Sequence, residues 1–273
     1  MNISKYGIPN AYCLLPIALK KQPMSKEQFI YGIRPVIEAI KSGKEIEKLL
    51  IQKGLRGEGF HQLHSFIREF EIPFQFVPVE KLNRTTRQNH QGIIAYLSEI
   101  SYQKLEYIIP FIYEQGKSPL ILVLDRITDV RNLGAIARTA ECAGVDGLLL
   151  PSKGSAQVNA DAVKTSAGAL YKLPVCRCPN LKDSIQFMKN SGLKIFAATE
   201  KAPVDYTKAD FTHPLALIMG SEEDGVSGEY IKMADELIGI PLMGEIASLN
   251  VSVASGILLY EMLRQRKQAE ERS

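Results

Sequence analysis

Short apolar runs alternate with amphipathic stretches along the second half of the chain. Five mostly aliphatic runs predict strands buried on both faces, as in a parallel sheet flanked by helices: Leu120–Leu124, Gly147–Leu150, Lys194–Ala198, Leu215–Met219 and Leu237–Ile240. The stretches between them place apolar residues three and four positions apart, which predicts helices at Leu133–Ala143, Ala156–Tyr171, Leu181–Asn190 and Gly228–Met233. A long closing helix is expected from Val251 to Glu270. The order predicts an α/β fold.

A smaller α/β pattern precedes this region. Strands are predicted at Lys48–Gln52 and Gly92–Leu97, and helices at Pro35–Ile40 and His61–Phe70. We therefore expect a small domain over residues 24–101, a linker over 102–118 and a larger domain over 119–273. Residues 1–23 fit no periodic pattern, and the run that begins at Met24 resembles a second start, so this leader is expected to be disordered or not native.

Composition excludes several classes of protein. The chain has 273 residues, of which 45% are hydrophobic and 23% charged, as in ordinary globular proteins. No apolar run approaches the ~18 residues that span a bilayer, and Tyr12–Leu19 lacks the cleavage site of a secretory signal. The cysteines are too irregular for a disulfide framework or a zinc site and predict reduced packing thiols at Cys13, Cys142, Cys176 and Cys178. With no signal, membrane span or disulfide framework, a cytoplasmic protein is expected. No metal is expected, because His61, His64 and His213 form no set of metal ligands.

Net charge by itself indicates no partner. The chain has 33 basic and 30 acidic side chains, but Lys5, Lys20 and Lys21 of the leader account for the excess. Local patches are more informative, because cationic side chains bind RNA phosphates. A predicted exposed loop contains Lys81, Arg84 and Arg87 with no acid, and Lys153, Lys164 and Lys172 form a second candidate cluster. Ordinary solvated surface is the alternative for both.

The first candidate site follows the strand that ends at Leu124. Asn132 is a plausible helix cap and Gly134 allows a close approach in the first turn. Arg138 lies less than two turns after Asn132, so both are expected to face the same end of the sheet. The alternative is an ordinary helix start with a solvated arginine.

The second candidate is the loop Gly220-Ser221-Glu222-Glu223-Asp224-Gly225. It follows a strand at the edge where α/β sheets bind ligands. It is neither a dinucleotide fingerprint nor a phosphate loop, and its three acids favour a cationic ligand over a phosphate-rich one. An acidic surface turn is the alternative.

The third candidate begins at Ile240-Pro241, where another strand ends, and continues into a helix rich in small residues near Ser248-Leu249-Asn250. Small residues allow close backbone approach to the sheet, to a ligand or to a second subunit.

Together the three segments resemble the motifs of the SpoU (TrmH-like) branch of the SPOUT RNA 2′-O-methyltransferases. The matching patterns are N-x-G-x-x-x-R, G-x-E-x-x-G and I-P-M/L-x-G…S-L-N-V-S-V-A, within about residues 120–266. The earlier unit, Phe29–Ser101, resembles the L30e-like RNA-binding domain of rRNA guanosine methylases, and His90–Ala95 is similar to the end of that domain.

The resemblance implies a deep trefoil knot at the C-terminus and a homodimer whose active site is completed across the interface. It also implies S-adenosylmethionine as cofactor, held by backbone groups at Gly220, Ile240 and Leu249, with Thr199 and Met219 beside them. Arg138 is the implied catalytic residue, and Asn132, Glu222, Ser248 and Asn250 would orient the reacting groups. An arginine side chain stays protonated in proteins, so an electrostatic role at the RNA phosphate and the developing alkoxide is favoured over that of a base.

The sequence thus predicts an S-adenosylmethionine-dependent RNA ribose 2′-O-methyltransferase, with a guanosine of large-subunit (23S) rRNA as the expected target. A tRNA guanosine 2′-O-methyltransferase and a non-catalytic RNA-binding relative remain as alternatives. A dinucleotide oxidoreductase is disfavoured, because the chain contains no G-x-G-x-x-G fingerprint.

Overall fold

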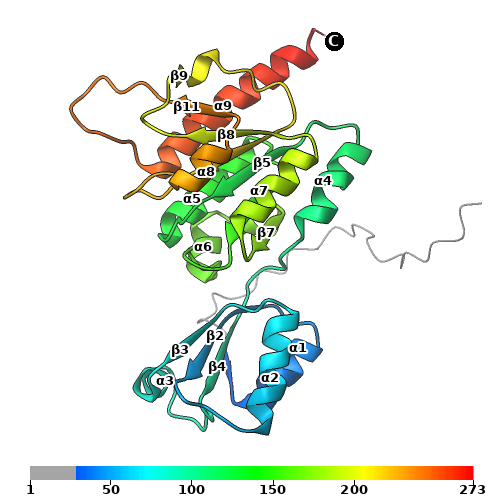
Figure 1. Ribbon diagram of the computed structural model, residues 1–273, viewed down its shortest axis with the longest axis vertical. Coiled ribbons are helices and arrows are strands. Elements are labelled where there is room, and N and C mark those ends of the chain that lie inside the picture. Colours follow the sequence, from blue (N-terminus) through cyan, green and yellow to red (C-terminus); the bar gives the residue numbers. More distant parts are fainter. Residues whose placement is uncertain (1–28, 273) are drawn as a thin grey trace, which may run out of the picture.

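A computed structural model describes residues 29–272, so the predictions for the leader, for Met24 and for Cys13 lie outside the described residues. The first of two sheets is small and mixed (Figure 1). Its strand order is β1 (Phe29–Tyr31), β4 (Ile93–Leu97), β2 (Ile46–Gln52), β3 (Phe74–Val77). Strand β4 is antiparallel to both neighbours, whereas β2 and β3 are parallel.

Helices cover the two faces of this sheet unequally. Helices α1 (Ile33–Lys41) and α2 (Glu58–Glu69) pack on one face, and the short helix α3 (Val79–Thr85) packs on the other. The prediction of a loop from Lys81 to His90 is wrong in its first half, because Lys81 and Arg84 lie on α3. Leu82 is fully buried against the sheet, which fixes that turn of helix in place.

The second sheet has seven strands, and every pairing between neighbours is parallel. Its order is β7 (Val175–Cys178), β6 (Gly147–Pro151), β5 (Leu120–Leu124), β10 (Leu215–Met219), β8 (Lys194–Ala198), β11 (Glu236–Gly239), β9 (Val204–Asp205). The five predicted strands are all present, which confirms the parallel α/β fold. Strands β7 and β9 were not predicted, because β7 contains a charged residue, Arg177, and β9 has only two residues.

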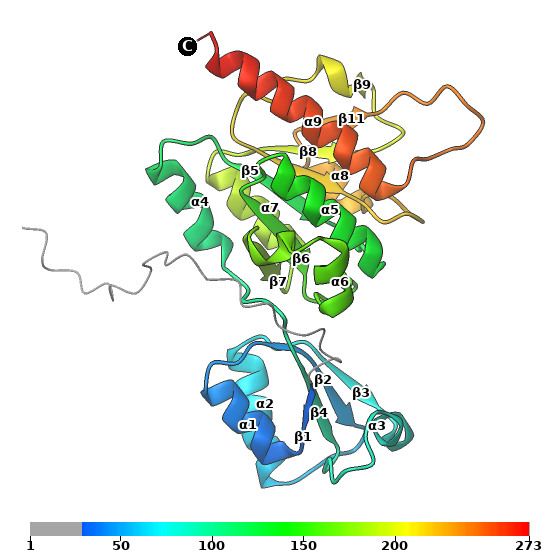
Figure 2. The same cartoon turned by 180° about the vertical axis from the view of Figure 1, so that it is seen from behind.

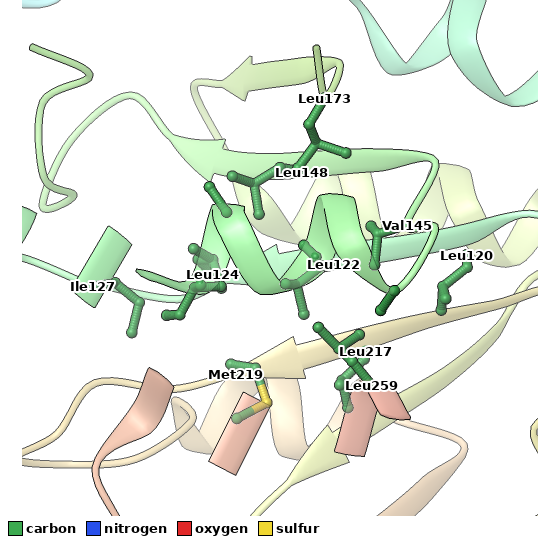
Figure 3. Close-up of a cluster of buried hydrophobic side chains, with 14 of the residues drawn as sticks. Leu120, Leu122, Leu124, Ile127, Val145, Leu148, Leu173, Leu217, Met219 and Leu259 are labelled. Carbon is green, nitrogen blue, oxygen red and sulfur yellow. The ribbon is translucent and has the colours of Figure 1, made fainter. Parts of the chain in front are cut away.

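Alternate residues of the central strand β5 face opposite cores. Leu120, Leu122 and Leu124 lie in the core that includes Leu259 (Figure 3), while Ile121 and Val123 lie in the other. Helices α5 (Val130–Cys142), α6 (Ala160–Thr165) and α9 (Val251–Glu270) cover the first face. Helices α4 (Leu105–Glu114), α7 (Leu181–Asn190) and α8 (Gly228–Met233) cover the second. Burial on both faces explains why these strands are almost entirely apolar.

Two predicted segments differ from the structure in an informative way. The expected helix Ala156–Tyr171 is broken after α6, because Ala167 and Gly168 have positive φ angles of 51° and 85°. The chain then resumes as a 3-10 turn at Ala169–Tyr171. The expected linker contains α4, whose apolar face is buried in the core of the larger sheet. The domain boundaries themselves stay a prediction.

Figures 1 and 2 show the two sheets as separate bodies, joined by the segment that leads into α4. Both views also show the segment between β11 and α9 extending away from the larger body. The trefoil knot implied for this region stays a prediction. Within residues 29–272 no helix is both long enough and apolar enough to cross a membrane.

Candidate functional site

Four neighbouring strands of the larger sheet end at the same edge. Because β5, β10, β8 and β11 are parallel neighbours, the loops that follow Leu124, Met219, Ala198 and Gly239 lie along one edge. From β5 the chain adds β6 and β7 on one side of the sheet. It then crosses to the other side of β5, where β10, β8 and β11 lie. Such a reversal of strand order opens a crevice at the carboxyl ends, which is where α/β sheets bind ligands.

Three polar side chains from the three candidate segments meet at this edge. The amide Nδ2 of Asn250 donates to Glu222 Oε1 at 2.7 Å and to Asn132 Oδ1 at 3.2 Å. Asn132 Nδ2 also donates to Glu222 Oε1, at 2.5 Å. One carboxylate oxygen therefore holds the starts of α5 and α9 together, a contact that periodicity could not show.

The helix caps at this cluster differ from the prediction. Asn132 does not cap α5; it is the third residue of the helix. The cap is Asp129, whose Oδ1 accepts from the backbone N–H groups of Arg131 at 2.7 Å and Asn132 at 2.8 Å. A carboxylate there also suits the positive end of the helix dipole. Asn250 caps α9 in the same way, because its Oδ1 accepts from Ser252 N at 2.9 Å.

An ion pair between a buried carboxylate and a partly exposed arginine, missed by the sequence reasoning, fixes the loop after β10. Asp125 is only 1% exposed and accepts from Arg126 Nε at 3.0 Å and from Ser227 N at 2.7 Å. Arg126, in the left-handed region at φ 59°, also donates to Asp224 Oδ2 and to the carbonyl oxygen of Gly225, both at 3.1 Å. An adjacent acid and base directly after a buried strand was the available signal.

These contacts correct the electrostatic interpretation of the acidic loop. Glu222 binds two amides and Asp224 pairs with Arg126, so two of the three acids already have partners. Glu223 remains exposed and has no hydrogen bond or ion pair in the part of the chain that the structure describes. Position 220 must be glycine because the backbone of Gly225 packs directly against it: a Cβ there would lie 2.0 Å from the Gly225 carbonyl carbon.

A cleft of about 320 Å³ lies beside this cluster. We call it the motif cleft; its lining includes Arg126–Asp129, Asn132, Gly154, Ser221–Asp224 and Val251. Arg138 is not part of the lining, so this cleft does not bring Asn132 and Arg138 together. Six residues of helix rotate a side chain by about 120° net at 3.6 residues per turn, so the two side chains leave α5 in different directions.

Arg138 instead projects from the exposed side of α5. It is exposed and forms no hydrogen bond or ion pair within residues 29–272. Helices α5 and α9 run side by side in the same direction, with Asn132 beside Asn250 and Thr139 beside Gly256. Ser248 is exposed in the extended segment and has no hydrogen bond to Asn132, Glu222 or Asn250.

The residues expected at the cofactor are only partly brought together. Met219 and Gly220 mark the end of β10, and Thr199 the end of β8. Thr199 N donates to the carbonyl oxygen of Ile238 at 3.0 Å, so β8 and β11 stay paired up to Ile238, two residues before Ile240. Leu249 is 39% exposed in the segment that extends from the body.

The basic residues lie at the surface, whereas the thiols differ in burial. All five basic residues predicted to bind RNA are exposed: Lys81, Arg84 and Arg87, and, around α6 on the larger domain, Lys153 and Lys164.

Cys176 and Cys178 are buried, as expected for packing thiols, and burial raises the pKa of Cys176 to about 12. Cys142 is exposed, so the packing prediction is wrong there. No metal-binding group of His, Cys, Asp or Glu occurs within the described residues.

Fold and site together define a parallel α/β protein whose polar cluster lies at the ligand edge of the sheet. Two family models match the chain: the SpoU rRNA methylase family over residues 119–260, and the RNA 2′-O ribose methyltransferase substrate-binding family over residues 29–103. The chain belongs to the SpoU family of RNA methyltransferases, which use S-adenosylmethionine.

Individual relatives agree with this assignment. The chain is 34% identical over 241 residues to a putative TrmH family tRNA/rRNA methyltransferase of Staphylococcus saprophyticus, covering 88% of this chain and 97% of that protein. The SpoU methyltransferase AviRb of Streptomyces viridochromogenes, solved with AdoMet, is similar at a TM-score of 0.57 and 26% identity, covering 89% of this chain and 91% of that one. An AdoMet-bound rRNA methyltransferase of Sinorhizobium meliloti aligns at a TM-score of 0.56 and 28% identity, with 86% of each chain covered.

Proposed function

We propose that this enzyme transfers the methyl group of S-adenosylmethionine to a ribose 2′-hydroxyl of RNA, at a guanosine of 23S rRNA. The observation that carries the proposal is the Asn132–Glu222–Asn250 cluster, which joins all three family motifs at one cleft. The match of residues 29–103 to a 2′-O ribose methyltransferase substrate-binding family supports the ribose as the acceptor. An rRNA substrate in turn favours the cytoplasm.

The reaction needs orientation and one proton transfer. A new C–O bond would form at the 2′-oxygen as the C–S bond to the methyl group breaks, the neutral thioether S-adenosylhomocysteine would be the leaving group, and the hydroxyl proton would pass to water. S-adenosylmethionine supplies the electrophilic methyl group when bound. Glu222 Oε1 accepts both amide donors, so the polar atoms of Asn132 and Asn250 are held in fixed positions at the cleft. Fixed polar groups lower the entropic cost of aligning two reactants.

The site is compatible with a sulfonium cofactor. Glu223 is exposed beside the loop and leaves a carboxylate for a cation. At Gly220 the loop folds back on its own backbone, so no side chain intrudes at the end of β10. We propose that backbone groups at Gly220, Ile240 and Leu249, with Thr199 and Met219, hold the cofactor.

We propose Arg138 as the catalytic arginine, acting on the RNA phosphate and the developing 2′-alkoxide. Its charge has no partner within the described residues, which leaves the guanidinium available to an anion. Its position outside the motif cleft is explained if the reaction site is completed by a second subunit. A planar guanidinium can bind a phosphate with two hydrogen bonds, whereas a lysine cannot.

A homodimer is proposed from the surface next to Arg138. Apolar side chains are strongly exposed on the extended segment and on α9: Met243 is 97% exposed, Ile246 80%, Val253 52% and Tyr260 52%. Large apolar side chains exposed close together mark protein interfaces, and Val253 and Tyr260 lie two turns apart on α9. A second copy of the chain would cover it and would bring its own Arg138 toward the motif cleft.

The RNA contacts are proposed at the two basic groups. Lys81, Arg84 and Arg87 lie on and after α3 of the small domain, and Lys153 and Lys164 lie on the larger one. All five are exposed and can bind phosphates.

The proposed function is tested by mapping methylation in 23S rRNA and tRNA from a strain lacking the gene, and by methylating both RNAs in vitro. Loss of one 2′-O-methylguanosine from 23S rRNA is expected; loss from a tRNA instead would support the alternative substrate.

The role of Arg138 has its own test. Arg138→Lys is expected to abolish most methyl transfer while S-adenosylmethionine still binds. Arg131→Lys, an exposed arginine on the same helix, is the matched control. Near wild-type transfer by Arg138→Lys would contradict the assigned role.

Shared active sites have a separate test. Mixed dimers of an Arg138→Ala chain and a Glu222→Ala chain are expected to regain activity, because one of their two sites then has both residues intact. No recovery in confirmed mixed dimers would mean that each chain uses its own Arg138.

A further inference from the structure

A second cleft lies between the two domains and has no assigned role. Its volume is about 240 Å³, and we call it the interdomain cleft. One wall comes from β2 and the start of β3, and the other from the loop after β6 together with Arg177 of β7; the lining residues are Glu47, Lys48, Pro73–Gln75, Pro151–Gln157 and Arg177.

The two walls are held together by a buried polar cluster. Glu47 of the small domain is 4% exposed and accepts from Arg177 Nη2 at 2.5 Å. Tyr102, between the domains, donates to Glu47 Oε2 at 2.6 Å, and its ring lies 4.0 Å from the guanidinium carbon of Arg177. Val158 N donates to Glu47 Oε1 at 3.1 Å. Burial, and next the charge of Glu47, raise the pKa of Tyr102 well above its usual value, so its hydroxyl keeps its proton and donates.

The charge of the cleft favours an anion. Glu47 is the only acid in the lining, and its carboxylate is occupied by the cluster. Lys48 and Lys153 line the cleft without an ion pair in residues 29–272. Partial burial, and next the nearby charge of Lys81, lower the pKa of Lys48. An anion bound beside Lys48 would offset that repulsion from Lys81.

The interdomain cleft adjoins the motif cleft. Gly154, in the loop from Ser152 to Val158, lines both of them. This loop is anchored on three sides: Ser152 N donates to Cys178 O at 2.8 Å, Ala156 N to Ile127 O at 2.7 Å, and Val158 N to Glu47. A chain of nucleotides leaving the motif cleft past Gly154 would meet Lys153 and then Lys48.

We propose that the interdomain cleft binds the unpaired nucleotides next to the methylated ribose, with their phosphates at Lys48 and Lys153. Glu47, Arg177 and Tyr102 are positioning residues that keep the two walls at a fixed separation. Gln75 and Gln157, which also line the cleft, offer amide groups to base edges. The inference rests on the proposed RNA methylation and adds the path of the substrate beside the reacting nucleotide.

The lysines are tested with the full chain and a 23S rRNA transcript. Lys48→Gln and Lys153→Gln are each expected to raise the Kd for the transcript roughly three- to tenfold. Each is also expected to reduce the slope of log Kd against log salt concentration by the amount that corresponds to about one phosphate contact. S-adenosylmethionine affinity should not change. Lys44→Gln is the matched control, because Lys44 is exposed on the small domain outside the cleft lining. Equal behaviour of all three variants would overturn the inference.

The positioning residues are tested with Tyr102→Phe, which removes one donor to Glu47 and keeps the ring against Arg177. A higher KM for the transcript, with unchanged S-adenosylmethionine affinity, is expected at a temperature well below unfolding, together with a lower unfolding midpoint because a buried hydrogen bond to Glu47 is lost. If KM stays at the wild-type value, Tyr102 does not position the walls.

The path of the RNA is tested by placing a photo-crosslinking amino acid at Gln75, with Gln62 on α2 as an exposed glutamine outside the cleft. Crosslinks from Gln75 are expected within a few nucleotides of the methylated ribose. Crosslinks only to distant nucleotides, or equal crosslinking from Gln62, would refute the path. A wild-type enzyme that methylates no RNA would instead refute the proposed function.

Discussion

Replacing Asp125 with asparagine should destabilise the protein while preserving the shape of the side chain. Asp125 is 1% exposed, and its two oxygens accept from the Nε and Nη2 of Arg126 at 3.0 and 3.2 Å and from Ser227 N at 2.7 Å. An asparagine amide has one acceptor oxygen, so its NH₂ group must face at least one of these donors. A buried donor left without an acceptor costs about 1–3 kcal/mol.

Losing the negative charge of Asp125 lowers the free energy of unfolding by less than losing one partner of a fully buried ion pair would. The Arg126 side chain is 38% exposed, so water screens part of the interaction. We therefore expect Asp125→Asn to lower the free energy of unfolding by about 2–3 kcal/mol. For a domain of this size that corresponds to a fall in Tm of roughly 4–12 °C.

Urea unfolding followed by far-UV circular dichroism measures this change, since the chain contains no tryptophan for fluorescence. Asp224→Asn is the matched control: Asp224 pairs with the same Arg126, but its side chain is 71% exposed. A surface pair is worth about 0–1 kcal/mol. Equal losses in the two variants, or a loss below about 0.5 kcal/mol at Asp125, would refute the reasoning that burial determines the cost.

Two further predictions follow from close packing and burial. Gly134→Ala should lower stability by about 1–3 kcal/mol despite better helix propensity, because the new Cβ would lie 2.6 Å from Thr165 Cβ; Gly228→Ala, with nothing within 4 Å, should not. Iodoacetamide at pH 8 should modify exposed Cys142 and leave buried Cys176 unmodified until the protein unfolds, because burial raises the pKa of Cys176 to about 12. Peptide mass spectrometry distinguishes the two thiols; rapid labelling of native Cys176 would contradict its burial.

The elements of the larger domain could be predicted from local pattern. Helices Leu181–Asn190, Gly228–Met233 and Val251–Glu270 and strands Leu120–Leu124 and Leu215–Met219 begin and end where the sequence indicated. Strands buried on both faces must be apolar throughout, so their limits are visible as soon as a polar residue appears. Short or edge elements such as β9 and α3 lack that signal and were missed.

The candidate site was only partly predictable. Motif resemblance selected Asn132, Glu222 and Asn250, and the structure brings these three together. The cap was misassigned because Asp129 and Asn132 are both good capping residues and the helix start differs by only three positions. Asp125 and Arg126 were overlooked because each is an ordinary residue whose role depends on a loop about a hundred residues later.

The sequence by itself determined the alternation of strands and helices, the parallel α/β class and the three motifs, because these depend on residues that are neighbours along the chain. Tertiary structure decided which distant segments meet. Glu47 contacts Arg177 across 130 positions and Asn132 contacts Asn250 across 118. The strand order that places β10 between β5 and β8 creates the ligand edge, and no local periodicity records that order. Contacts of that kind depend on the path of the whole backbone.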